Sequence, residues 1–268
     1  MKEKVIEVRN LIKKFGSFVA NDNLNFDVYK GEIFGFLGAN GAGKTTAMKI
    51  LCGLSSPTSG QVKVAGFDIH KETEKVKRNI GYMSQKFSLY EDLTIAENIR
   101  FYSGIYGIKP AERKEKMERL LKNLDIESAR DSLIGSLPLG WKQKLAFSVA
   151  IFHDPKIVFL DEPTGGVDPI TRRKFWDLIY EASDQGITVF VTTHYMDEAE
   201  YCNRVSIMNE GRIEALDTPE NLKTMNSKYE TIYRFSTEGI STHFPRPAND
   251  DYHFRNPDRA ADVVRKSD

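Results

Sequence analysis

The sequence contains little cysteine and no net charge. Its 268 residues include two cysteines, Cys52 and Cys202, and neither belongs to a pair with metal-site spacing. Two scattered thiols are typical of a reducing compartment, and we expect both to be small buried side chains. Lysine and arginine (38) balance aspartate and glutamate (38), so the formal net charge is +0. A protein bound to nucleic acid mainly through phosphates would be basic, so no nucleic-acid partner is expected.

Long hydrophobic runs are also missing. No stretch approaches the ~20 apolar residues that a membrane helix needs, and the opening residues, MKEKVIEVRN, lack the apolar centre of a signal peptide. With 40% hydrophobic and 28% charged residues, the composition is typical of a soluble globular protein. We therefore expect any membrane role to depend on a partner that supplies the spanning segments.

Short apolar segments of strand length recur along the chain. Val5–Leu11 and Leu24–Tyr29 alternate apolar and polar residues, whereas Ile33–Leu37 is a continuous apolar run that leads into glycines, as a buried parallel strand does. Helical stretches separate several later strands, so the pattern predicts a parallel sheet covered on both faces. The other expected strands are Gln61–Val64, Ile80–Met83, Ile157–Leu160, Val189–Thr193 and Val205–Met208.

Two further regions predict helices. The sequence has a helical pattern from Thr94 to about Leu124, with charges around an apolar stripe, and Trp141–Phe152 predicts another helix. After about residue 226 the composition becomes polar and includes several prolines. We therefore expect residues 227–268 to be an appendage or a flexible tail.

The run Gly38–Thr45, GANGAGKT, fits the pattern G-x-x-x-x-G-K-[ST] at every fixed position. Glycines let backbone N–H groups turn around a phosphate, and the following helix presents its positive end to the anion. Lys44 can then reach the β- and γ-phosphates, and the Thr45 hydroxyl can bind Mg²⁺. The motif alone predicts a nucleotide-binding protein: a kinase, a GTPase, a motor or a transporter. The residues expected to contact the nucleotide are Gly38, Asn40, Gly41, Ala42, Gly43, Lys44, Thr45 and Thr46.

Two acids follow the apolar segment Ile157–Leu160. A buried strand there would place the carboxylates of Asp161 and Glu162 at its C-terminal edge, where α/β sheets bind ligands. Asp161 is expected to hold the Mg²⁺ shell. Glu162 is expected to polarise the attacking water, which predicts hydrolysis rather than phosphoryl transfer to another substrate.

These two sites and four further stretches resemble the ATP-binding cassette family, and they occur in the family's order. Asp161–Thr164 followed by Gly165–Asp168 resembles the Walker B motif and D-loop, and His194 resembles the switch histidine. Gln85 resembles the Q-loop glutamine, and Phe15 stands where the family places an aromatic ring against adenine.

The resemblance covers about residues 4–226 and implies an α/β fold. This would be a P-loop NTPase core with a mainly parallel sheet, an N-terminal antiparallel β-subdomain, and a helical signature subdomain at about 86–152. The nucleotide-binding domain would occupy 1–226, ahead of the appendage at 227–268. The implied ligands are ATP and Mg²⁺. The implied partners are a transmembrane permease and a second nucleotide-binding subunit, either identical or different.

The resemblance also implies roles for single residues. Gln85 would sense Mg²⁺ and the attacking water, and His194 would contact the γ-phosphate, so these two would form the catalytic set with Glu162. Asp168 would act across the dimer interface. Without the family context, Gln85 could be a surface amide, His194 a satisfied core histidine, and Phe15 an ordinary core residue. The implied metal ligands are Thr45, Gln85 and Asp161.

The family signature Leu-Ser-Gly-Gly-Gln is altered in this chain, where Leu137–Trp141 reads LPLGW. In the family this segment grips the γ-phosphate bound to the opposite subunit. Pro138 has neither a hydroxyl nor an N–H, which removes one charge-assisted hydrogen bond of roughly 1.5–3 kcal/mol. Gly140 can still donate its N–H, and we expect Gly140 and Trp141 at the dimer-interface phosphate. The signature is either altered but usable, or degenerate and paired with an intact second subunit.

The resemblance as a whole implies an ATP-binding and ATP-hydrolysing subunit that powers translocation by a separate permease. It would be peripheral, at the cytoplasmic face of the cell (inner) membrane. LPLGW resembles the signature of export subunits, so export is expected. One alternative is a cassette ATPase of DNA repair or translation, but such proteins usually carry two cassettes or a long coiled coil. Another is a regulatory module without turnover, which the presence of Glu162 and His194 disfavours.

Overall fold

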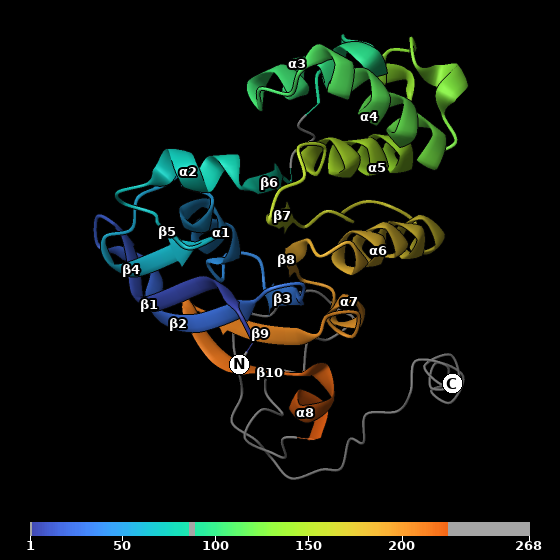
Figure 1. The fold of residues 1–268 in the computed structure, drawn as a ribbon. Coiled ribbons are helices and arrows are strands. Elements are labelled where there is room, and N and C mark those ends of the chain that lie inside the picture. The colour runs from blue at the N-terminus through green and yellow to red at the C-terminus, as the bar shows by residue number, and fades with distance from the viewer. Residues whose placement is uncertain (1, 86–88, 225–268) are drawn as a thin grey trace, which may run out of the picture. The chain divides into compact units, whose positions relative to one another are not determined.

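The computed structural model describes residues 2–85 and 89–224. The chain divides into two compact units, Met1–Thr218 and Pro219–Asp268. Figure 1 labels the elements of both.

The second unit contributes one described element, the short helix α8 (Pro219–Thr224). The predicted domain boundary at 226 and the predicted tail at 227–268 lie outside the described residues, as does the start of the predicted helical subdomain at 86. These three boundaries stay predictions.

A six-stranded sheet forms the centre of the first unit, in the order β10-β9-β3-β8-β7-β6. Its strands are parallel except for β10, which pairs antiparallel with β9. Every residue of β3, β7 and β8 is buried, which explains their continuous apolar sequences. These three strands are parallel neighbours, so their C-terminal ends meet at one edge. The strands are β3 (Ile33–Gly38), β6 (Ile80–Met83), β7 (Ile157–Asp161), β8 (Thr188–Thr193), β9 (Arg204–Asn209) and β10 (Arg212–Asp217).

The N-terminal residues form a separate antiparallel sheet, in the order β2-β1-β4-β5, which confirms the expected subdomain. Its first two strands run further than the alternation predicts, because a tight turn at Gly16, with φ 59°, lets them pair almost to their ends. The strands are β1 (Lys4–Phe15), β2 (Phe18–Tyr29), β4 (Ser59–Val64) and β5 (Phe67–Asp68).

One hydrophobic core joins the two sheets and the helix α1 (Lys44–Leu51). Phe26 of β2 stacks on Phe34 of β3 with ring centroids 5.7 Å apart, and Phe36 and Phe190 pack around the same pair. Aromatic contacts of this kind add to the free energy gained by burying the rings. The core therefore fixes α1, and the loop before it, against strands of both sheets.

Three helices, α3 (Ile95–Ile105), α4 (Pro110–Asn123) and α5 (Leu139–Ala150), gather beyond the edge of the central sheet (Figure 1). The continuous helical pattern predicted from Thr94 to Leu124 is broken in two. Gly107, with φ 71°, lies just after the end of α3, and Pro110 begins α4, the positions that glycine and proline favour.

The remaining helices are short or lie along the central sheet. Helix α5 begins two residues earlier than predicted because Pro138 takes the N-cap position. Within residues 2–85 and 89–224, no helix combines the length and the hydropathy that crossing a bilayer requires. The other helices are α2 (Thr73–Arg78), α6 (Pro169–Asp184), α7 (Met196–Ala199) and the 3₁₀ turns Glu127–Ala129 and Ile134–Ser136.

Candidate nucleotide site

The loop 39–43 joins β3 to α1, as the phosphate-binding motif predicts. Gly41 and Gly43 have φ of 82° and 98°, a region that glycine adopts without strain. A Cβ on Gly43 would lie 2.3 Å from the carbonyl oxygen of Ala20. Nδ2 of Asn21 donates a hydrogen bond of 3.1 Å to the carbonyl of Gly43. Strand β2 therefore packs directly behind the loop, and only glycine fits there.

The loop is closed on one side and open on the other. Ala42 is buried, and its carbonyl accepts a hydrogen bond of 3.0 Å from the N–H of Gly211 in the turn between β9 and β10. Asn40 and Gly41 are exposed, and nothing lies within 4 Å of a Cβ at Gly41. Thr46, in the first turn of α1, is half-buried. A glycine-rich loop that is exposed on one face and precedes a helix N-terminus fits a phosphate group.

Lys44 is almost completely buried at the start of α1, with 4% of its surface exposed. Its Nζ donates to the carbonyl oxygens of Gly38 and Ala39, at 2.7 and 3.0 Å, and lies 3.5 Å from Oε1 of Glu162. Burial lowers the pKa of Lys44, and the Glu162 carboxylate acts in the opposite direction. The structure thus brings the two predicted motifs into direct contact.

Thr45 and Asp161 are two of the three predicted metal ligands and contact each other, whereas Gln85, the third, bonds to Glu162. The Thr45 hydroxyl donates to Oδ1 of Asp161 at 3.1 Å, and the Thr192 hydroxyl donates to the same oxygen at 2.7 Å. No group of three or more His, Cys, Asp or Glu side chains that could cage a metal occurs in the described part of the chain. Mg²⁺ is commonly held by one or two carboxylates together with substrate phosphates and water. One hydroxyl beside one carboxylate fits that kind of site.

Glu162 lies at the centre of the predicted catalytic residues. Gln85, which follows β6, donates from Nε2 to Oε2 of Glu162 at 3.0 Å. Nδ1 of His194, which follows β8, lies 3.2 Å from the same oxygen. The Glu162 side chain is 9% exposed, whereas Gln85 is exposed and His194 is partly so. The acid therefore sits at the inner end of a cluster that opens to solvent.

The backbone of Glu162 takes an uncommon conformation. Its φ is 47°, in the left-handed region that costs a residue with a Cβ free energy. Its N–H donates to the hydroxyl of Thr192 at 3.0 Å, and that hydroxyl in turn donates to Asp161. Thr192 therefore supports both acids at once.

Phe15 lies at the end of β1, with 55% of its surface exposed. The Nζ of Lys13 lies 4.8 Å from the centroid of its ring. The strand that continues the hairpin, β2, carries Ala20 and Asn21, which contact Gly43. The ordinary-core interpretation of Phe15 does not fit this exposure.

The signature helix contacts the D-loop, and the D-loop residue Gly165 donates its N–H to the carbonyl of Glu162 at 3.1 Å. Within the described residues, no hydrogen bond or ion pair joins Gly140 or Trp141 to Lys44 or Glu162. A Cβ on Gly140 would lie 2.6 Å from Cγ2 of Thr171 in α6.

Asp168 caps the N-terminus of α6. Its Oδ1 accepts from the N–H groups of Ile170 and Thr171, both at 3.0 Å, and bonding to Thr171 lowers the pKa of Asp168. Gln143 of α5 donates at 3.2 Å to the carbonyl of Gly165, which ties the signature helix to the D-loop.

Sequence reasoning missed Thr192 and Gln143 as site residues. Strand register pairs Asp161 with Thr192, and no local motif carries that information. In the sequence, the two adjacent threonines before His194 could have indicated that Thr192 belongs to the site. A side chain at the end of a buried parallel strand faces the ligand edge.

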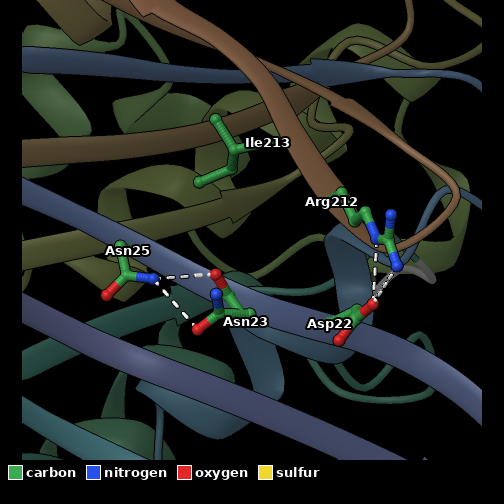
Figure 2. A pocket seen from close by; sticks show the side chains of 5 residues that line it. All are labelled: Asp22, Asn23, Asn25, Arg212 and Ile213. Atoms are coloured by element: carbon green, nitrogen blue, oxygen red, sulfur yellow. Dashed lines mark hydrogen bonds and ion pairs between the residues drawn. The ribbon is translucent and has the colours of Figure 1, made fainter.

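A separate hollow lies between β2 and β10 (Figure 2). Its polar side chains bond to one another: Arg212 pairs with Asp22 at 2.6 and 2.8 Å, and Asn25 donates to Asn23. None of the predicted nucleotide ligands is among the described residues that line it, so it is distinct from the candidate site.

Comparison with known proteins identifies the family of the chain. Residues 21–165 match the family model described as ABC transporter. The chain is 33% identical over 241 residues to "Linearmycin resistance ATP-binding protein LnrL" of Bacillus subtilis, covering 90% of this chain and 77% of that protein. This chain belongs to the ABC transporter family. The family and the fold expected from the sequence are thereby confirmed.

Two further relatives of this ABC transporter chain are informative. It is 49% identical over 228 residues to "Probable multidrug ABC transporter ATP-binding protein YbhF" of Escherichia coli, covering 85% of this chain but 39% of that protein. The chain thus matches about two fifths of the length of YbhF. A solved dimer of the ATP-binding cassette MJ0796, in a post-hydrolysis state with ADP and Pi, aligns with TM-score 0.71 and 26% identity, over 80% of this chain and 98% of that one.

Proposed function

We propose that this chain is the ATP-binding and ATP-hydrolysing subunit of an ABC exporter and powers substrate translocation by a separate transmembrane permease. The observation that carries the proposal is the convergence of Lys44, Gln85 and His194 on the carboxylate of Glu162. A lysine on a phosphate-binding loop and an acid that can accept a proton are what hydrolysis of a nucleoside triphosphate needs.

Each residue has a role that follows from its place. Lys44 stabilises negative charge on the transferred phosphoryl group, and Glu162 accepts hydrogen bonds from the attacking water. Gln85 and His194 hold the Glu162 carboxylate in one orientation. Thr45 and Asp161 would hold Mg²⁺, which supplies charge neutralisation for the phosphates when bound.

The partners are part of the proposal. In the described residues no hydrogen bond or ion pair joins Gly140 or Trp141 to Lys44 or Glu162, so we assign the phosphate contacts expected of them to the nucleotide of a second nucleotide-binding subunit. The dimeric state of the MJ0796 cassette supports that arrangement. We place the chain at the cytoplasmic face of the inner membrane, bound to its permease. YbhF and LnrL carry names of drug transport or resistance, which supports export over a role in DNA repair or translation.

The central test compares Glu162→Gln with the parent chain. Hydrolysis should slow by ~10²–10⁴-fold, while equilibrium ATP binding stays within a few fold, because the amide keeps the shape but accepts no proton. Glu210→Gln is the matched control, since Glu210 is an exposed acid that also has a positive φ, 45°. Near-parental turnover in Glu162→Gln would refute the assignment.

A second test addresses the altered signature. Glu162→Gln should retain bound ATP, and it should therefore form an ATP-dependent dimer on size-exclusion chromatography if the Pro138 signature is usable. A monomer at saturating ATP would instead support pairing with a different subunit.

Co-purification of the full chain with a multi-span membrane protein supports the transport role, whereas recovery with DNA or ribosomes would contradict it.

A further inference from the structure

Glu198 is a buried acid with no part in the nucleotide site described above. It lies in the four-residue helix α7, and none of its surface is exposed. Burying an ionised carboxylate costs free energy unless hydrogen bonds and counter-charge compensate for the lost water. What surrounds Glu198 therefore indicates what the acid does.

Two threonine hydroxyls and one guanidinium surround the carboxylate. The Thr164 hydroxyl donates a short hydrogen bond to Oε1, and the Thr193 hydroxyl donates to Oε2 at 2.5 Å. Nε of Arg172, from α6, lies 3.5 Å from Oε1. Burial raises the pKa of Glu198, and the two hydroxyl donors and Arg172 act against that change.

The two threonines stand next to the proposed catalytic pair in sequence. Thr164 comes two residues after Glu162, and Thr193 comes immediately before His194. Oε2 of Glu162 and Nδ1 of His194 are 3.2 Å apart. One carboxylate thus bridges the two segments that carry Glu162 and His194.

We propose that Glu198 is a positioning residue, which holds Glu162 and His194 at their working separation by accepting a hydrogen bond from the segment of each. The inference rests on the proposed function. The bridge also explains why an acid occupies the interior: a carboxylate offers two oxygens that accept hydrogen bonds in fixed directions, which no apolar side chain of similar size does.

The hydrogen-bond arrangement requires a carboxylate rather than an amide. The Thr193 hydroxyl already accepts from the N–H of Tyr195 at 3.0 Å, so its own proton points to Glu198. A glutamine in place of Glu198 would present one NH₂ group to a hydroxyl that is donating. It would also leave Arg172 without this counter-charge. Glu198→Gln should therefore open the bridge while nearly preserving side-chain volume.

The experiment measures steady-state ATP hydrolysis by the full chain and variants that have parental circular dichroism spectra. Thr164→Val and Thr193→Val should each lower kcat by about 10–100-fold, because catalytic groups displaced by about 1 Å lose about that much rate. The KM for ATP should change less than about 3-fold. Thr164→Ser and Thr193→Ser keep the donor and should restore most of kcat.

The two valine substitutions should not be additive, because both act through Glu198. The double variant should be about as slow as the slower single variant. Thr188→Val is the matched control: Thr188 is buried in the same strand, β8, and bonds to the N–H of Gly31 instead. Its kcat should remain within about 2-fold of the parent. Additive losses, or equal losses in the control, would overturn the proposal.

An NMR measurement, which does not depend on ATP turnover, tests the Glu198 bridge separately from the proposed function. The ring resonances of His194, assigned by NMR with His194→Ala, should shift in Glu198→Gln and in Thr193→Val but not in Thr188→Val. Unchanged resonances in the first two variants would overturn the bridge even if the parent hydrolyses ATP. A parent that does not hydrolyse ATP would contradict the proposed function, while the resonances would still decide the bridge.

Discussion

Replacing Thr192 by valine removes one hydroxyl that serves both acids of the site. That hydroxyl donates to Asp161 at 2.7 Å and accepts from the N–H of Glu162 at 3.0 Å. Thr192 is fully buried and Asp161 is 2% exposed, so water cannot easily replace the lost partners. A hydrogen bond to a charged group contributes about 1.5–3 kcal/mol and a neutral one about 0.5–1.5 kcal/mol. The N–H of Glu162 also donates to the Thr192 carbonyl at 3.2 Å, which valine keeps, so Thr192→Val should lower the free energy of unfolding mainly through Asp161, by about 1.5–3 kcal/mol.

The assay is urea denaturation followed by circular dichroism, with the same measurement on Thr188→Val. Thr188 is equally buried in the same strand but accepts a single neutral hydrogen bond, from the N–H of Gly31 at 2.9 Å, so its loss should be about 1 kcal/mol. Thr192→Val should also lower kcat, because the hydroxyl helps to hold Glu162 at its positive φ. Equal destabilisation by the two substitutions would refute the reasoning.

Three further predictions use single positions. Gly43→Ala should destabilise the chain by about 1–3 kcal/mol in thermal unfolding, because its Cβ would meet the carbonyl of Ala20 at 2.3 Å; an unchanged melting temperature would contradict the packing. Burial lowers the pKa of His153 from 6.5 to about 4, so the unfolded chain binds more protons between these values and stability falls as pH drops through that window, by up to about 3 kcal/mol. His153→Phe, which loses the bond to the Ile80 carbonyl, should lack this pH dependence in urea denaturation. An equal fall of the free energy of unfolding with pH in the variant and the parent would contradict the prediction. Phe15→Ala should weaken ATP binding by about 5–100-fold, the range for loss of base stacking, whereas Phe15→Tyr should not; equal affinities in calorimetry would remove Phe15 from the site.

The parts of the site that could be predicted are those that short segments encode. GANGAGKT and the strand that ends in Asp161-Glu162 each specify their own local structure and chemistry. Parallel packing then brings them together, because β3, β8 and β7 are neighbours whose C-terminal ends share an edge. Gln85 and His194 reach Glu162 for the same reason, since each lies within two residues of the C-terminal end of a strand of that sheet.

The parts that could not be predicted depend on register and on contacts between distant segments. Thr192 supports Asp161 only because β7 and β8 pair in one register, and Glu198 meets Thr164 only after α7 folds back against the loop that follows β7. The break between α3 and α4 is different, because Gly107 and Pro110 in the sequence could have predicted it. The apolar stripe instead favoured one continuous helix. Strand β10 was missed because its residues mix charged and apolar side chains without clear alternation.

A crystal structure of Glu162→Gln with Mg²⁺ and ATP tests the central claim most directly, because the claim is that the lysine loop and the strand-end acids serve one bound nucleotide. We expect the γ-phosphate in contact with Nζ of Lys44, the metal beside Thr45 and Asp161, and residue 162 facing the γ-phosphate. A nucleotide bound elsewhere, or a γ-phosphate out of reach of either motif, would contradict it.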